Sequence, residues 1–250
     1  MPENNVQQRS AVAKARFYDQ HWLARGQNLH YTELMRAEFI VGGIREYVGG
    51  AGCQILDLGC GRGWMAAVLS PLGKVVGVDF SPAGIQFAKD NYGDHGEFVL
   101  GDAASETLGL PPDRRFDVVV CTEVIEHVED QPRFIRQIKG FLKPRGWLLL
   151  TTPNGNVWQE FSTHRAMVHT LQPVESWIRP SRLSQMLRAE GFTIQTHEGR
   201  PLYELRLGRH RWLQRRLFHR LCVSLGYEHK YGRFMLMDAL YQFLAARAPD

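Results

Sequence analysis

The sequence lacks several features that would place the chain in a membrane or in an oxidising compartment. It has no apolar run of the ~18 residues that a membrane-spanning helix needs, and residues 1–5 lack the basic-then-apolar pattern of a signal peptide. Its cysteines show no metal-like spacing, and most lie in or beside apolar segments, which favours reduced thiols; they are Cys53, Cys60, Cys121 and Cys222. We therefore expect a cytoplasmic protein without disulfides.

The composition and charge are those of an ordinary globular chain. Hydrophobic residues make up 44% and charged residues 22% of the 250 residues, so the chain can bury a sizeable core. The net charge of +4 does not by itself indicate nucleic-acid binding. Much of the basic excess falls between Arg200 and Arg233.

From residue 53 onward, short apolar segments alternate with helical ones. Strands are predicted at 54–58, 74–79, 97–100, 116–121, 147–152 and 192–196, with a last one ending the stretch 236–246. Helices are predicted at 11–22, 32–47, 64–69, 82–91, 132–142 and 181–190, with Ser81 capping the fourth of them. Such alternation predicts an α/β fold with a doubly wound, mostly parallel, seven-stranded sheet.

The domain organisation follows from the same pattern. Residues 1–50 are predicted to form an N-terminal helical lid and residues 51–155 the nucleotide-binding core. Residues 156–250 then supply a substrate cap and the C-terminal strands that complete the same sheet, so the chain is a single domain overall.

A glycine-rich turn follows the first predicted strand. Gly59, Gly61 and Gly63 allow positive φ and a close approach of the backbone to a ligand. Their G-x-G-x-G spacing differs from the G-x-G-x-x-G of dinucleotide sites. Asp57 would repel a pyrophosphate but attract an ammonium group, so the turn indicates a cationic ligand.

The ends of the next two strands carry residues that suit an adenosine. Asp79 ends the second strand, where a carboxylate can accept both ribose hydroxyls. Asp102 and the Ala103 amide follow the third strand and can contact the adenine, and Phe80 offers an apolar wall for the base.

These segments together resemble the successive motifs of class I S-adenosylmethionine (SAM)-dependent methyltransferases. The similar segments are residues 55–63, 76–79, 101–102 and 116–119, in the same order and spacing, and the match covers residues 53–152. The resemblance implies a Rossmann-like fold in which the glycine turn surrounds the methionine part of SAM. An NAD(P)-binding domain, or a glycine turn without a ligand, is the alternative that the spacing and Asp57 disfavour. The expected cofactor-binding residues are Arg36, Asp57, Gly59, Cys60, Gly61, Asp79, Phe80, Asp102, Ala103 and Thr122.

Arg36 enters this set through the resemblance alone. In the similar quinone-pathway enzymes, an arginine of the preceding helix pairs with the SAM carboxylate, and Arg36 lies at a similar offset from Asp57. A solvated charge on the helix surface is the alternative.

The fourth strand runs into an E-x-x-E-H segment formed by Glu123, Glu126 and His127. On a helical turn these three positions share one face, and two carboxylates with an imidazole suit Mg²⁺, Mn²⁺ or Zn²⁺. The segment resembles that of ubiquinone-pathway O-methyltransferases and of small-RNA 2′-O-methyltransferases. In both groups a later histidine completes a metal site that binds two neighbouring substrate hydroxyls.

The later histidine is where this sequence departs from the pattern. The family's histidine falls at about Gln172, and the nearest histidines are His164 and His169. The predicted metal ligands are therefore Glu123, Glu126, His127 and His169, with a weakened or absent site as alternatives. Without a metal, His127 becomes a general base, or it has only a structural role.

Residues 153–180 and 200–235 do not follow the strand–helix rhythm and are predicted to cover the substrate. Aromatic residues there and near the N-terminus are interpreted as pocket lining, with burial in the core as the alternative; they include Phe17, Tyr18, Trp22, Trp158, Phe161 and Trp177. Residues 206–221 form a predicted basic amphipathic helix. It suits a membrane surface, an anionic substrate or RNA, or it packs on the domain with a solvated basic side.

The sequence thus predicts a SAM-dependent methyltransferase that modifies a phenol or catechol hydroxyl of a small molecule from quinone or secondary metabolism. The alternatives are RNA 2′-O-methylation, small-molecule N- or carboxyl-methylation, and a SAM-binding partner without catalysis. RNA is disfavoured because there is no separate RNA-binding domain and only one basic helix. Peripheral membrane contact through residues 206–221 would suit a lipophilic acceptor.

Overall fold

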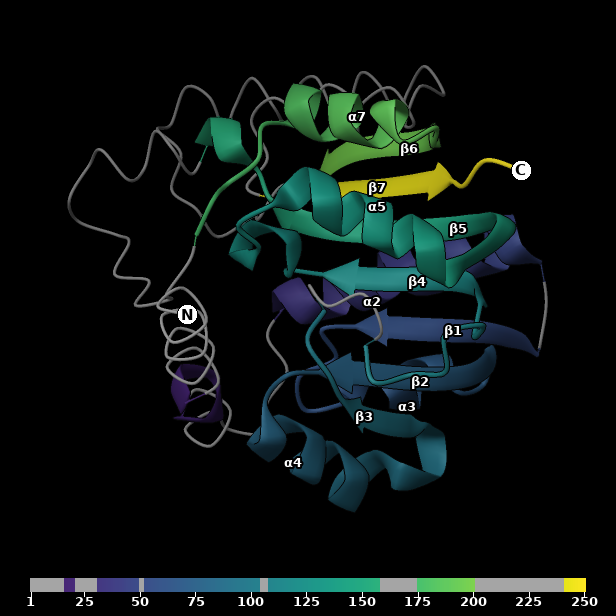
Figure 1. Ribbon diagram of the computed structural model, residues 1–250, viewed down its shortest axis with the longest axis vertical. Helices are drawn as coiled ribbons and strands as arrows, with labels where there is room; N and C mark the ends of the chain where they lie inside the picture. Colours follow the sequence, from purple (N-terminus) through teal and green to yellow (C-terminus); the bar gives the residue numbers. More distant parts are fainter. Residues whose placement is uncertain (1–15, 21–30, 50–51, 104–107, 158–174, 201–240) are drawn as a thin grey trace, which may run out of the picture.

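A computed structural model describes residues 16–20, 31–49, 52–103, 108–157, 175–200 and 241–250 (Figure 1). The described chain builds one seven-stranded sheet in the order β3-β2-β1-β4-β5-β7-β6. The strands are β1 Cys53–Leu58, β2 Gly73–Asp79, β3 Glu97–Leu100, β4 Phe116–Thr122, β5 Leu142–Pro153, β6 Thr193–Arg200 and β7 Tyr241–Arg247. Strand β7 pairs antiparallel with β5 and β6, and the other pairings are parallel. The predicted fold class is confirmed.

Helices cover both faces of this sheet. They are α2 Tyr31–Gly43, α3 Trp64–Leu69, α4 Pro82–Tyr92, α5 Gln131–Phe141 and α7 Pro180–Ala189. Short turns of other helix types occur at Ile44–Val48 (π) and at Gly93–His95 and Ile125–His127 (3₁₀), and residues 16–20 form a short helical segment, here called helix 16–20. In Figure 1, α5 and α7 lie in front of the sheet, and α2 and α3 lie behind it.

The two faces bury separate apolar clusters. Along β1, Leu56 and Leu58 join the cluster that contains residues of α5 and α7, whereas Ile55 joins the cluster with α2 and α3. This alternation is the period of two that a strand covered on both faces requires. The predicted free cysteines are confirmed at Cys53, Cys60 and Cys121, and Cys222 lies outside the described residues.

Local capping fixes where several helices begin and end. The Ser81 hydroxyl accepts from the Gly84 amide at 3.0 Å and caps α4, as predicted. Asp130 caps α5 by accepting from the Arg133 amide at 3.0 Å. Gly49, at φ 77°, ends the π-helical turn after α2 because its left-handed backbone conformation favours glycine.

Some predicted boundaries differ from the structure. Strand β5 begins at Leu142, five residues earlier than predicted, because the chain passes directly from α5 into pairing with Phe116 across a register shift. The helix predicted at 32–47 is an α-helix that continues as a π-helical turn. Of the helix predicted at 11–22 the structure describes residues 16–20, and the predicted basic helix 206–221 lies outside the described residues. Within the described residues no helix is both long enough and apolar enough to cross a membrane.

Candidate active site

The carboxyl ends of three adjacent parallel strands gather the predicted cofactor residues at one edge of the sheet. Asp57 lies near the end of β1, Asp79 ends β2, and Thr122 ends β4. In a doubly wound sheet this edge is where ligands bind. Helix 16–20 lies beyond the same edge in Figure 1, past the arrowheads of β1, β2 and β4.

The glycine turn is hydrogen-bonded to strand β2. Gly59, Gly61 and Gly63 have φ values of 81°, 55° and 78°, as predicted for this turn. The amides of Gly59 and Cys60 donate to the Val78 carbonyl at 2.8 and 3.0 Å. The Cys60 side chain is buried in the cluster under α2 and α3, so it supports the turn from the core side.

Gly59 also brings the turn into contact with the segment after β4. A Cβ atom at Gly59 would lie 2.3 Å from Cγ2 of Val124, which is far closer than real contacts. Val124 lies between Glu123 and Glu126. The cofactor turn and the E-x-x-E-H segment are therefore in direct contact.

Asp57 is a buried carboxylate with an unsatisfied oxygen. Its exposed fraction is 1%, and its Oδ2 has no hydrogen-bond partner among the described residues. Burial, reinforced by the nearby charge of Asp79, raises the pKa of Asp57 to about 7. A donor or a cation from a ligand would satisfy a buried acceptor of this kind.

Asp79 is held rigidly beside Asp57. Its Oδ2 accepts from the Gly61 amide and its Oδ1 from the Ser81 amide, both at 2.9 Å. Burial raises the pKa of Asp79 even though these hydrogen bonds lower it. A carboxylate has about four lone-pair sites, so both oxygens can still accept from ribose hydroxyls.

Helix 16–20 lies against the predicted adenosine wall. The Tyr18 ring packs edge-on against Phe80, with centroids 4.9 Å apart, and lies 6.1 Å from the His127 ring. The Asp19 carboxylate accepts from the Ser81 hydroxyl and from the Ala83 amide. The ring contacts of Tyr18 agree with the prediction that Phe17, Tyr18 and Trp22 fold over the crevice, which stays a prediction, and Trp22 lies outside the described residues.

The predicted adenine contacts are described only in part. The Gly101 amide donates to the Asp79 carbonyl at 2.9 Å. Of the two residues that follow, Asp102 is exposed and Ala103 is buried. Residues 104–107 lie outside the described residues. The assignment of Asp102 and Ala103 to the adenine therefore stays a prediction.

Arg36 reaches the carboxyl end of β4 from helix α2. Its Nη2 lies 3.0 Å from Oε2 of Glu123, and the two side chains are 15% and 18% exposed. Thr151 donates to the other Glu123 oxygen at 3.0 Å, and the Arg36 guanidinium lies 5.1 Å from the Tyr241 ring centroid. The alternative of a solvated helix charge is wrong, because Arg36 is mostly buried inside the site.

The helical turn predicted for Glu123, Glu126 and His127 is wrong. Glu123 has φ 57°, and the following residues form a 3₁₀ turn, Ile125–His127, rather than an α-helix. The two carboxylates have different partners. Glu123 pairs with Arg36, and Glu126 accepts from the Thr152 hydroxyl at 2.8 Å.

Glu126 is the more deeply buried of the two carboxylates. It is 2% exposed, and burial together with the charge of Glu123 raises its pKa. His127 Nε2 lies 3.8 Å from Glu126 Oε1. In the part of the chain that the structure describes, no group of three or more His, Cys, Asp and Glu side chains could hold a metal ion. His164, His169 and Gln172 lie outside that part.

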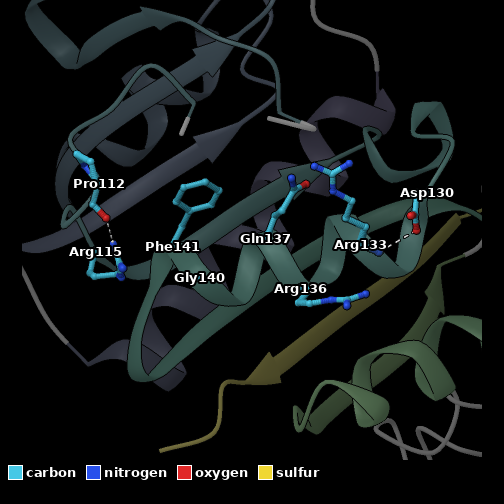
Figure 2. Close-up of a pocket in the computed structure, with 8 residues that line it drawn as sticks. All are labelled: Pro112, Arg115, Asp130, Arg133, Arg136, Gln137, Gly140 and Phe141. Atoms are coloured by element: carbon cyan, nitrogen blue, oxygen red, sulfur yellow. Dashed lines mark hydrogen bonds between the residues drawn. The ribbon is translucent and has the colours of Figure 1, made fainter. Parts of the chain in front are cut away.

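A surface pocket of about 560 Å³ lies elsewhere, along the outer side of α5. Figure 2 shows that its arginines Arg115, Arg133 and Arg136 point in different directions rather than toward one point. Arg115 donates to the carbonyl groups of Pro112 and Arg114, and Arg136 pairs with Glu190 at 3.4 Å. This pocket contains none of the predicted site residues.

Comparison with known proteins agrees with the geometry of the sheet edge. Residues 19–197 match the family model of a methyltransferase domain. The chain belongs to the class I SAM-dependent methyltransferases. The matched region includes helix 16–20 from Asp19 onward and every described residue of the candidate site except Tyr18 and Tyr241.

Two curated relatives of this methyltransferase are named ubiquinone biosynthesis O-methyltransferase. The mitochondrial protein of Schizosaccharomyces pombe is 30% identical over 192 residues, covering 71% of this chain and 69% of that protein. The protein of Rhodopseudomonas palustris (strain BisB5) is 30% identical over 158 residues, covering 60% of this chain. The matched part spans 62% of the Rhodopseudomonas protein's length.

A solved structure supports the fold independently. The N-methyltransferase NodS from Bradyrhizobium japonicum WM9, in complex with S-adenosyl-L-homocysteine (SAH), aligns with a TM-score of 0.63. The alignment covers 95% of this chain and all of that one at 13% identity. At this identity the likeness concerns the fold alone.

Proposed function

We propose that the chain binds SAM at the ends of β1 and β2 and transfers its methyl group to a phenolic or catecholic hydroxyl of a small molecule. The observation that carries cofactor binding is the buried Asp57 Oδ2 without a partner, beside a glycine turn and the fixed carboxylate of Asp79. SAM brings an ammonium group and a ribose diol, which match these two acceptors. The acceptor class is supported by the O-methyltransferase relatives.

In this proposal Arg36 faces the carboxylate of the methionine part, while Glu123 and Tyr241 hold the guanidinium in place. Glu123 fixes it from one side at 3.0 Å, and the Tyr241 ring lies on another. Burial raises the pKa of Tyr241 to about 12, and the Glu123 charge adds to the increase, so the phenol stays neutral. A neutral, ordered neighbour keeps Arg36 oriented.

His127 is proposed as the group that removes the proton of the acceptor hydroxyl. Methyl transfer from a sulfonium needs the nucleophile, methyl carbon and sulfur in line, and a positioned base suffices for a phenol. The described donor set does not fit the predicted metal site, because Glu123 is engaged by Arg36 and Thr151, Glu126 is engaged by Thr152, and no three described His, Cys, Asp or Glu side chains gather to hold a metal ion. No step of the proposed mechanism runs through a metal.

Cofactor binding is tested by calorimetry with SAH on the full chain. Unmodified protein is expected to bind SAH, and Asp57→Asn to weaken binding by at least about tenfold, because a charge-assisted hydrogen bond is lost. The matched control is Asp94→Asn, an exposed carboxylate in the 3₁₀ turn after α4. Equal affinity of the two variants would contradict the assignment of Asp57.

The acceptor is tested with labelled SAM and a panel of catechol, simple phenols, aromatic carboxylic acids, amines and a short RNA with a terminal ribose diol. We expect methyl ethers of the phenols, identified by mass spectrometry. Methylation of the carboxylic acids, amines or RNA alone would overturn the acceptor class. Activity that persists in excess EDTA supports His127 as the base, whereas loss that Mg²⁺ or Mn²⁺ restores would contradict it.

Contact of residues 206–221 with a membrane surface also stays a proposal. It is supported by the basic, amphipathic sequence and by the lipophilic acceptors expected of a quinone pathway. Sedimentation with anionic vesicles tests it, with neutral vesicles as the control. Equal sedimentation with both would overturn it.

A further inference from the structure

Helix 16–20 is tied to the start of α4 by one side chain. Asp19 Oδ1 accepts from the Ser81 hydroxyl and, at 3.1 Å, from the Ala83 amide. The Ser81 hydroxyl in turn accepts from the Gly84 amide. Asp19 and Ser81 together therefore satisfy two of the amides that are left free in the first turn of α4, and the negative charge suits the positive end of that helix.

This attachment is made next to the proposed ribose site. The amide of Ser81 donates to Asp79 at 2.9 Å, so the residue that holds helix 16–20 also orients the ribose-binding carboxylate. The charge of Asp19 lies close enough to raise the pKa of Asp79. Detachment of helix 16–20 from α4 would therefore affect Ser81, which itself contacts the proposed ribose-binding carboxylate of Asp79.

Tyr18, the neighbour of Asp19, lies between the two halves of the site. One edge contact reaches Phe80 on the adenosine side, and the other reaches His127 on the acceptor side. Burial raises the pKa of Tyr18, and the charges of Glu126, Asp79 and Glu175 add to the increase. The ring thus stays neutral where cofactor and acceptor must meet.

The geometry points to Tyr18 as a positioning residue that serves both substrates. With Asp19 fixed to α4, the Tyr18 ring closes the space between the adenosyl group and the acceptor beside His127. This role rests on the proposed function. It predicts that removal of the ring damages the alignment of the two substrates more than it damages cofactor binding.

The attachment is tested first, without an acceptor, by SAH calorimetry on the full chain. Asp19→Ala is expected to weaken SAH binding about tenfold, whereas Asp19→Asn keeps an acceptor oxygen and stays within about twofold. Gln20→Ala, an exposed residue of the same helix, is the control. An Asp19→Ala affinity equal to that of Gln20→Ala would overturn the attachment.

The positioning role is tested with catechol at saturating SAM, with rates divided by the SAH-binding stoichiometry so that misfolded protein does not count. Tyr18→Ala is expected to lower kcat about 100-fold while SAH affinity falls about tenfold or less. Tyr18→Phe keeps both ring contacts and is expected to keep kcat within about threefold. Equal losses in kcat and SAH affinity, or a full loss in Tyr18→Phe, would overturn the shared role.

The two proposals fail in different ways. If the unmodified chain binds SAH but leaves catechol unmethylated, the acceptor class is contradicted, and the Asp19 comparison still decides the attachment. If the unmodified chain binds no SAH, the proposed function fails and the inference fails with it. If binding and turnover are intact and Tyr18→Ala equals Gln20→Ala, only the inference is wrong.

Discussion

The two halves of the candidate site are built in different ways. On the cofactor side, Asp57, the glycine turn and Asp79 lie within 23 residues of sequence, and backbone amides take part in the hydrogen bonds that hold the turn and Asp79. On the acceptor side, Glu123 and Glu126 are held by side chains from α2 and β5, far away in the sequence. Because its partners are close in sequence, the arrangement of the first half can be predicted from its motif. The E-x-x-E-H motif of the second half does not reveal the distant side chains that hold its carboxylates.

The largest effect is expected from the ion pair between Arg36 and Glu123, which joins the two halves. Arg36→Met leaves Glu123 without its cation and should lower the free energy of unfolding by about 3 kcal/mol, since breaking a largely buried pair strands a charge. The double variant Arg36→Met/Glu123→Met should recover most of that loss. Denaturant unfolding measures both, and a double variant no more stable than Arg36→Met would show that the pair is not coupled.

A substitution of His127 is expected to change turnover without changing cofactor affinity. His127→Asn should lower kcat by about 100-fold or more, the usual contribution of a general base, while SAH affinity stays unchanged. Turnover of catechol and SAH calorimetry give the two values. A parallel loss of SAH affinity would mean that His127 itself also holds the cofactor.

The buried Asp57 makes cofactor binding depend on pH. Its pKa is raised from 3.8 to about 7 in the free protein, and the ligand ammonium needs the ionised form. SAH affinity should therefore be constant above pH 7 and fall about tenfold per pH unit below it. Calorimetry between pH 5.5 and 8.5 checks this, with Asp57→Asn expected to lose the dependence.

The same raised pKa affects the stability of the cofactor-free protein. Because the folded state holds the proton more tightly than the unfolded state, Asp57 makes the free energy of unfolding decrease as pH rises through the interval from about 4 to about 7. Saturating SAH should remove this decrease. Thermal unfolding with and without SAH tests the difference, and identical profiles would contradict the coupling.

The smallest expected effects come from two matched helix caps. Ser81→Ala and Asp130→Ala each remove one capping acceptor and should each cost about 1 kcal/mol of stability. Only Ser81→Ala should also weaken SAH binding, by a few-fold, because Ser81 lies beside Asp79 and Asp19. Equal SAH affinities for the two variants would show that the cap of α4 does not contribute to cofactor binding.

The sheet and the cofactor half could be predicted from local patterns. Strands covered on both faces read as short apolar runs, and the Ser81 cap, the glycine turn and Asp79 depend on residues close in sequence. The sequence also pointed to Tyr18 by its aromatic character outside the sheet pattern. The early start of β5 was missed because Lys143, Pro144 and Arg145 carry no apolar signal, although Leu142 pairs with Phe116.

The acceptor half could not be predicted in the same way. The spacing of Glu123, Glu126 and His127 suggests a helix, but Glu123 has a positive φ and its side chain pairs with Arg36 and Thr151, which no local pattern reveals. Thr151 and Thr152 were missed as partners, although the register of β4 and β5 places Thr151 opposite Thr122. Tyr241 and Asp19 were missed because their partners lie far away in the sequence. Tyr241 lies beside Arg36, and Asp19 accepts from Ser81 and Ala83.

The contact between Gly59 and Val124 has a consequence for attempts to change which acceptor this methyltransferase uses. Val124 is flanked by the groups that would face the acceptor, so it is an attractive position for a library of variants. Its side chain already fills the space that any Cβ at position 59 would need. A larger residue at position 124 would push against the cofactor turn itself. Most members of a library at this position would therefore bind SAM poorly, whatever acceptor they could accommodate.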